Sequence, residues 1–207
     1  MHVGEMSKNQ QSEVTHPLRR LNVGCGRNIL AGWINLDVKP LPGVDVVADL
    51  ELCASVPLPI EDDSVDEFLL SHVIEHVRDS LGVMQELYRI AKANAKVTIR
   101  VPYGGSDDAW EDPTHVRAYF ADSFGYFSQP YYWRADYGYR ADWQPKKITL
   151  FAYARACKGL PPQLMLEKIH TQRNIVREMV AELVAIKPAR KPMRNLASAP
   201  KLEVTLV

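Results

Sequence analysis

The chain of 207 residues is 46% hydrophobic and balances 25 basic against 25 acidic side chains, so its formal net charge is zero. This length suits one domain with extensions, and the lack of a basic excess argues against a nucleic-acid partner. Three cysteines lack metal-ligand spacing, and no apolar run approaches the roughly 18 residues of a membrane span. We therefore expect a cytoplasmic protein with neither disulfides nor a membrane span.

The first 16 residues are polar and predict a flexible leader. Five short apolar runs follow, and their composition is typical of strands covered on both faces. The runs end at Gly24, Asp37, Asp49, Ser71 and Pro102. Residues 78–95, before the fifth run, place apolar side chains at helical spacing and predict an amphipathic helix. Strands that alternate with crossovers predict an α/β fold with a mostly parallel sheet and helices on both faces.

The sequence pattern changes after Tyr103. A loop to about Arg117 and a short helix over 121–128 precede two runs, 131–140 and 146–156, that predict an antiparallel strand pair at the sheet edge. A long amphipathic helix is predicted from about Pro162 to Ile186, and residues 201–207 predict a last strand. We divide the chain into a leader (1–16), a main domain (17–157) and a C-terminal helix and tail (158–207). This last part would pack on the domain or on the partner subunit of a homodimer.

Two glycines, Gly24 and Gly26, stand one residue apart where the first predicted strand ends. Ligands of doubly wound sheets bind beyond the carboxyl ends of the strands, where Asp37 and Asp49 also lie. A carboxylate at the end of the second strand suits the two hydroxyls of a ribose. A dinucleotide fingerprint needs a small residue at the sixth position from Gly24, so Ile29 counts against NAD.

Four segments, "LNVGCG", "INLDV", "VVADLE" and "PIEDDSVDEFLLSHVIEHV", resemble in order and spacing the class I S-adenosylmethionine-dependent methyltransferases, which have a Rossmann-like fold. The likeness is closest to small bacterial members with a Ser-His-x-x-Glu-His segment, and it continues through "DPTHVRAYFADSF". It implies S-adenosylmethionine as cofactor, with the two glycines near the methionine moiety, Asp37 on the ribose and Asp49 at the adenine edge. The residues assigned to cofactor binding are Asn22, Gly24, Cys25, Gly26, Asp37, Asp49, Leu50, Ser71 and His72. Asn22 departs from the family pattern, which usually has an acidic residue there.

The segment "HVIEH" places His72, Glu75 and His76 at positions i, i+3 and i+4. The same spacing occurs in inverted zinc proteases. Some quinone-pathway methyltransferases that hold a divalent metal resemble this segment, with a glutamate in place of His72. A histidine there disfavours a hard cation. We therefore predict no metal, with Glu75 and His76 hydrogen-bonded to nearby backbone so that they fix the loop.

The segment from Asp112 to His115 follows the fifth predicted strand and can fold over the same crevice. A neutral imidazole can take a proton from a substrate hydroxyl. His115 is therefore the first candidate for a catalytic base, and His76 is the second. Asp112 favours a turn, and we assign it to the substrate site together with Tyr103 and Trp110.

These features predict an S-adenosylmethionine-dependent methyltransferase that acts on an oxygen atom of a small molecule or of a sugar in a surface glycan. The Asn-Pro-Pro-Tyr-like signature of amide and base N-methylation is absent, and "SHVIEH" stands in its place. Two alternatives stay open. One is a non-catalytic binding module that retains the fold, and the other is a nicotinamide-dependent oxidoreductase.

Overall fold

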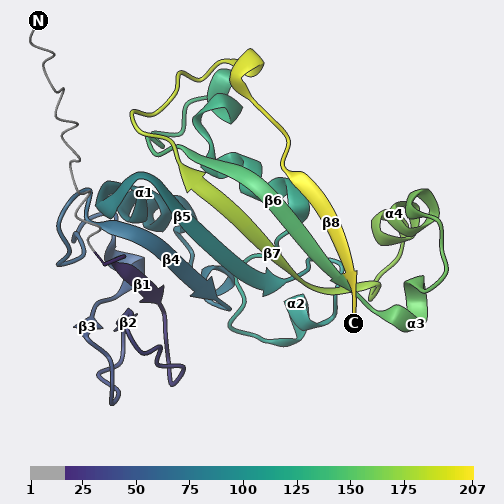
Figure 1. Cartoon of the computed structure of the whole chain (residues 1–207), viewed down its shortest axis with the longest axis horizontal. Helices are drawn as coiled ribbons and strands as arrows, with labels where there is room; N and C mark the ends of the chain where they lie inside the picture. Colours follow the sequence, from purple (N-terminus) through teal and green to yellow (C-terminus); the bar gives the residue numbers. More distant parts are fainter. Residues whose placement is uncertain (1–16) are drawn as a thin grey trace, which may run out of the picture.

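The computed structural model describes residues 17–207, so the predicted leader lies outside the described part of the chain. Figure 1 shows one continuous twisted sheet with the C-terminus at the end of its last strand. Its eight strands lie in the order β3-β2-β1-β4-β5-β7-β6-β8. The strands are β1 (Arg20–Val23), β2 (Ile34–Asp37), β3 (Val46–Val47), β4 (Val65–Ser71), β5 (Ala91–Pro102), β6 (Trp143–Ala152), β7 (Val176–Ala185) and β8 (Lys201–Leu206).

Parallel pairing dominates this sheet. β1 pairs in parallel with β2 and β4, β2 with β3, β4 with β5, and β6 with β8. Only β7 runs antiparallel to its neighbours, β5 and β6. The predicted mostly parallel α/β sheet is therefore confirmed. The antiparallel strand, however, lies inside the sheet, whose edges are β3 and β8.

The region predicted as one long helix divides into a helix and a strand. Pro162–Thr171 forms the helix α4, but Val176–Ala185 forms β7, so the helix prediction is wrong for this second half. Along β7 the buried residues Met179, Ala181 and Leu183 alternate with half-buried ones, which is the period of a strand. The slot between β5 and β6 offers backbone hydrogen-bond partners on both sides, and only a strand can use them.

Residues 131–140 do not form the predicted strand either. Their first part belongs to the 3-10 helix η4 (Gln129–Trp133), and the rest is loop. The antiparallel partner of β6 is β7, so the expected domain boundary after Cys157 falls between two strands that pair with each other. Of the apolar residues that suggested a packing surface, Val176, Met179 and Leu183 are buried in β7.

The amphipathic helix predicted before the fifth strand is confirmed as α1 (Ser80–Ile90). Asp79 caps its start, because its carboxylate accepts a hydrogen bond from the Gly82 N–H at 2.8 Å. Trp143 of β6 donates from its ring nitrogen to the Met84 carbonyl at 2.8 Å, which holds α1 against the sheet. The remaining helices are short: α2 (Asp108–Glu111), α3 (Ala154–Cys157), η1 (Leu50–Leu52), η2 (Ile74–His76), η3 (Ala121–Phe127) and η5 (Arg194–Leu196). No helix among residues 17–207 is long and apolar enough to cross a membrane.

The two faces of the central sheet differ in their cover. Val97 and Ile99 of β5 are fully buried on the face beneath α1, whereas Lys96 is exposed and Arg100 half-buried on the opposite face. Arg100 forms an ion pair at 3.6 Å with Glu178 of the neighbouring strand β7. The connections from β1 to β2 and from β2 to β3 contain turns and no helix. The expected helical cover is therefore present on the face of the sheet beneath α1. On the opposite face, charged side chains of β5 and β7 occupy this part of the sheet.

Candidate active site

A cavity of about 310 Å³ opens at the carboxyl ends of β1, β2 and β4. Parallel strands bring their carboxyl ends to one edge of the sheet, so residues that are distant in the sequence meet there. The cavity is lined by Gly24, Leu36, Asp37, Val38, Ala48, Asp49, Leu50, Glu51, His72, Val73, His76 and Val77. Six of the predicted site residues are among them: Gly24, Asp37, Asp49, Leu50, His72 and His76.

The glycine loop has the backbone that glycine permits. Gly24 has φ +63° and Gly26 has φ +52°, both in the left-handed region. A Cβ atom on Gly24 would lie 2.7 Å from Cγ2 of Val73, whereas a Cβ atom on Gly26 would meet nothing within 4 Å. Asp37 fixes the loop by accepting a hydrogen bond from the Gly26 N–H at 2.7 Å, and its other oxygen accepts from the Lys39 N–H at 2.9 Å. Each oxygen keeps a second lone pair for a ligand.

Asn22, Cys25 and Ser71, which were predicted to bind the cofactor, are not among the residues that line the cavity. Asn22 is buried, and its amide donates to the Asn28 carbonyl at 2.8 Å and to Oδ1 of Asn35 at 3.0 Å. Cys25 is also buried, and this burial raises the pKa of its thiol. Ser71 ends β4 beside the cavity. The structure therefore gives Asn22 the role of tying the loop to the second strand.

His72 has an unusual backbone for a residue with a side chain, with φ +56°. This conformation directs its ring between two acids. Nδ1 lies 3.3 Å from Oε1 of Glu75, and Nε2 lies 3.5 Å from Oε2 of Glu178. Glu75 in the first place, and Glu178 in addition, raise the pKa of His72. Glu178 is not among the predicted site residues, because it lies in the segment that was predicted to be helical.

The segments around His76 and His115 meet although they are far apart in the sequence. The Val116 N–H donates to the Glu75 carbonyl at 2.9 Å, and the two imidazole rings lie edge to face with centroids 4.7 Å apart. Nδ1 of His76 lies 2.9 Å from Oγ1 of Thr114. One ligand atom each from Glu75, His76 and His115 lies within 4.8 Å of the others.

Glu75 does not behave as predicted. Its side chain is 2% exposed, and neither carboxylate oxygen has a hydrogen-bond partner among the described residues. The prediction that Glu75 bonds to nearby backbone is therefore wrong for its side chain. His76 does contact backbone, because its Nδ1 lies 3.4 Å from the Thr114 carbonyl, and the same atom lies 2.9 Å from Oγ1 of Thr114. Thr114 was not predicted as a partner of His76, and its place in the "DPTH" segment beside His115 is the signal that could have indicated it.

The predicted substrate residues lie at different depths. Asp112 is half exposed beside the histidine pair, and its Oδ2 is 3.9 Å from Nε2 of His115. Trp110 is 64% exposed and donates from its ring nitrogen to the Gly104 carbonyl at 2.9 Å. Tyr103 is buried, and this burial raises the pKa of its hydroxyl. Of the three, Asp112 stands nearest to the two candidate bases.

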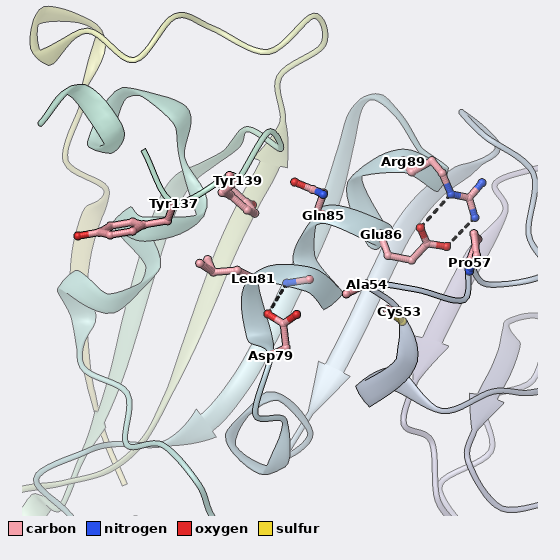
Figure 2. A pocket seen from close by; sticks show the side chains of 12 residues that line it. Cys53, Ala54, Pro57, Asp79, Leu81, Gln85, Glu86, Arg89, Tyr137 and Tyr139 are labelled. Atoms are coloured by element: carbon pink, nitrogen blue, oxygen red, sulfur yellow. Dashed lines mark hydrogen bonds and ion pairs between the residues drawn. The ribbon is translucent and has the colours of Figure 1, made fainter. Parts of the chain in front are cut away.

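A second cavity, of about 550 Å³, lies between the segment after η1, helix α1 and the loop before β6. Figure 2 shows Tyr137 and Tyr139 on one side of it and the paired Glu86 and Arg89 on the other. No predicted site residue lines this cavity, and Asp79, which does, is used as the cap of α1. Its buried polar groups are already paired with one another, so the cavity at the strand ends is the better candidate for a cofactor.

Residues 21–99 match a protein family described as a methyltransferase domain. Comparison with curated protein sequences gave no match. Among solved structures, a SAM-dependent methyltransferase from Archaeoglobus fulgidus is 17% identical, with a TM-score of 0.57 over 81% of this chain and 86% of that one. The YcgJ protein from Bacillus subtilis is 15% identical, with a TM-score of 0.51 over 83% and 93% of the two chains. A possible histamine N-methyltransferase from Thermotoga maritima is 13% identical, with a TM-score of 0.51 over 84% of each. At these identities the likeness to the solved structures is one of fold.

Proposed function

We propose that this S-adenosylmethionine-dependent methyltransferase methylates a hydroxyl group of a small molecule or of a sugar in a surface glycan. The domain match supports the enzyme class and its cofactor. The assignment of each residue and the choice of acceptor are our proposals.

The cavity at the strand ends is the observation that carries the proposal. Gly24 lines it without a side chain, and Asp37 and Asp49 line it at successive strand ends. We assign Asp37 to the ribose hydroxyls, because the backbone donors at Gly26 and Lys39 hold its carboxylate in place and leave lone pairs free. Asp49 and Leu50 would then hold the adenine, and Gly24 and Gly26 would lie beside the methionine moiety.

The chemistry asked of the protein is alignment and proton transfer. The sulfonium of S-adenosylmethionine is an activated methyl donor, so the acceptor oxygen forms the new C–O bond as the C–S bond breaks. Alignment of the two partners lowers the barrier. The hydroxyl proton passes to a base, for which we propose Nε2 of His115, with His76 as the second candidate. Asp112 stands beside this nitrogen and would orient the acceptor.

Calorimetric titration with S-adenosylhomocysteine, with NAD as the parallel ligand, tests the donor site. We expect saturable binding of S-adenosylhomocysteine alone. Binding of NAD alone would favour an oxidoreductase and contradict the proposal. No binding of either ligand would contradict the assignment of the cavity.

Turnover then tests the acceptor class. The protein is incubated with S-adenosylmethionine and a panel of hydroxyl and amine acceptors, and mass spectrometry follows the gain of one methyl group. We expect products from hydroxylated acceptors. Methylation of amines alone would contradict oxygen as the acceptor, and binding of the cofactor without any product from the panel would favour the binding module.

A further inference from the structure

Glu75 is a buried carboxylate whose one charged neighbour among the described residues, His72, is itself partly exposed. Both of its oxygens lack a hydrogen-bond partner among residues 17–207, and its one ion-pair contact there is with His72. Desolvation of a carboxylate costs free energy that hydrogen bonds or a cation normally offset. The Val116 N–H donates to the Glu75 carbonyl, and the Glu75 side chain is enclosed, with 2% of its area exposed.

Hydrogen bonds set the tautomers of the two histidines beside it. Oγ1 of Thr114 donates its one hydrogen to Asp112 at 2.6 Å, so it must accept from Nδ1–H of His76 at 2.9 Å. Nδ1 of His115 lies 3.2 Å from the Ala109 carbonyl, which can only accept. Each ring therefore carries its proton on Nδ1 and keeps the Nε2 lone pair free.

We infer that Glu75, His76 and His115 form a binding site for a divalent first-row transition-metal ion such as Zn²⁺. The three residues bring ligand atoms within 4.8 Å of one another. Two imidazoles and one carboxylate suit Zn²⁺ or Fe²⁺, whereas Mg²⁺ and Ca²⁺ prefer oxygen atoms alone. The hydrogen bonds on the two Nδ1 atoms are the outer contacts that metal-bound histidines usually make, here to Thr114 and the Ala109 carbonyl.

The inferred site adjoins the proposed donor cavity, because His76 lines that cavity. Three protein ligands leave a coordination position open, as in catalytic zinc sites. A role of the metal ion in the reaction rests on the proposed function: an acceptor hydroxyl bound to the ion would lose its proton more readily. With both Nε2 atoms bound to the ion, that proton passes to the exposed Asp112 carboxylate and then to water, as the C–O bond forms and the C–S bond breaks. Metal binding itself does not depend on this use.

Titration of the full chain with Zn²⁺ and with Co²⁺, after removal of metals by a chelator, tests the site. Calorimetry should give one ion per chain, and Co²⁺ should give a visible absorption band. Glu75→Gln and His115→Ala should each weaken binding roughly 100-fold or more, because even the loss of an outer contact weakens metal sites 10–100-fold. His115→Gln serves as the second variant if either protein fails to fold.

Two controls separate this site from other histidines. His170→Ala removes an exposed histidine of α4, and a double variant of His2 and His16 to alanine removes those of the leader. Both should bind the metal as the unchanged chain does. Absence of saturable metal binding would overturn the inference. Metal binding that is unchanged in Glu75→Gln and His115→Ala would also overturn it, as would metal binding that is lost in the leader variant. S-adenosylhomocysteine binding is measured on the same samples, so failure of the metal site is distinguished from failure of the donor site.

Discussion

Glu75 and Glu86 are both buried glutamates, with 2% and 7% of their areas exposed, yet their surroundings differ completely. Glu86 accepts from the Leu58 N–H at 2.6 Å and from two nitrogens of Arg89 at 2.6 and 2.9 Å. Glu75 accepts no hydrogen bond from the described residues. The fold uses the Glu86 carboxylate to join α1 to the loop before β4. It leaves the Glu75 carboxylate without a hydrogen bond, with only the ion pair to His72, beside two further imidazoles. A buried acid without hydrogen bonds is the better marker of a site.

The largest effect is expected for Glu86→Ala. It leaves the Arg89 guanidinium, whose pKa Glu86 raises, without its main partner in a half-buried place. We expect the free energy of unfolding to fall by about 3–5 kcal/mol in urea denaturation. Glu61→Ala, which removes an exposed partner of Arg19, is the matched control and should change it by less than about 1 kcal/mol. Equal losses of unfolding free energy in Glu86→Ala and Glu61→Ala would contradict the greater structural role of the buried glutamate.

His115→Ala tests the proposed site around Glu75. Turnover should fall about 100-fold, because the proposed proton transfer or metal coordination is lost. The affinity for S-adenosylhomocysteine, measured by calorimetry, should stay nearly unchanged, and His170→Ala should alter neither. A large loss of cofactor affinity in His115→Ala would instead show that the segment covers the donor.

Asp37→Ala sharpens the assignment of the donor cavity. The dissociation constant of S-adenosylhomocysteine should rise roughly 10- to 30-fold, which corresponds to about 1.4–2 kcal/mol and to the lower part of the range for a hydrogen bond to a charged group. Asp136→Ala, which removes an exposed ion pair with Arg140, should leave the constant unchanged. Unchanged affinity in Asp37→Ala would contradict the ribose assignment.

The smallest effect is expected for the stability of Glu75→Gln. With metals removed by a chelator, its free energy of unfolding should differ by less than about 1 kcal/mol from that of the unchanged chain, or rise. The substitution removes only the ion pair with the partly exposed His72, and it also removes a buried charge. Urea denaturation beside Glu86→Ala gives the direct comparison. A loss of about 3 kcal/mol or more would mean that the fold itself uses the Glu75 carboxylate.

Local sequence determined the first half of the sheet and the position of the cavity. An apolar run followed by Gly24 and Gly26 predicts a strand and a tight loop, and the left-handed φ of both glycines bears this out. Asp37 and Asp49 were predictable as neighbours, because carboxyl ends of parallel strands share one edge. Both line the cavity together with Gly24.

Only the tertiary structure decided the second half of the sheet and the grouping of the histidines. The segment Val176–Ala185 carries apolar residues that fit a helical or a strand period, and the slot between β5 and β6 selects the strand. In the same way, His76 and His115 are 39 positions apart, and the bond from Val116 to the Glu75 carbonyl brings their rings together. The lack of hydrogen-bond partners for the Glu75 carboxylate cannot be predicted from its neighbours along the chain. Burial and hydrogen bonding depend on segments that meet only on folding.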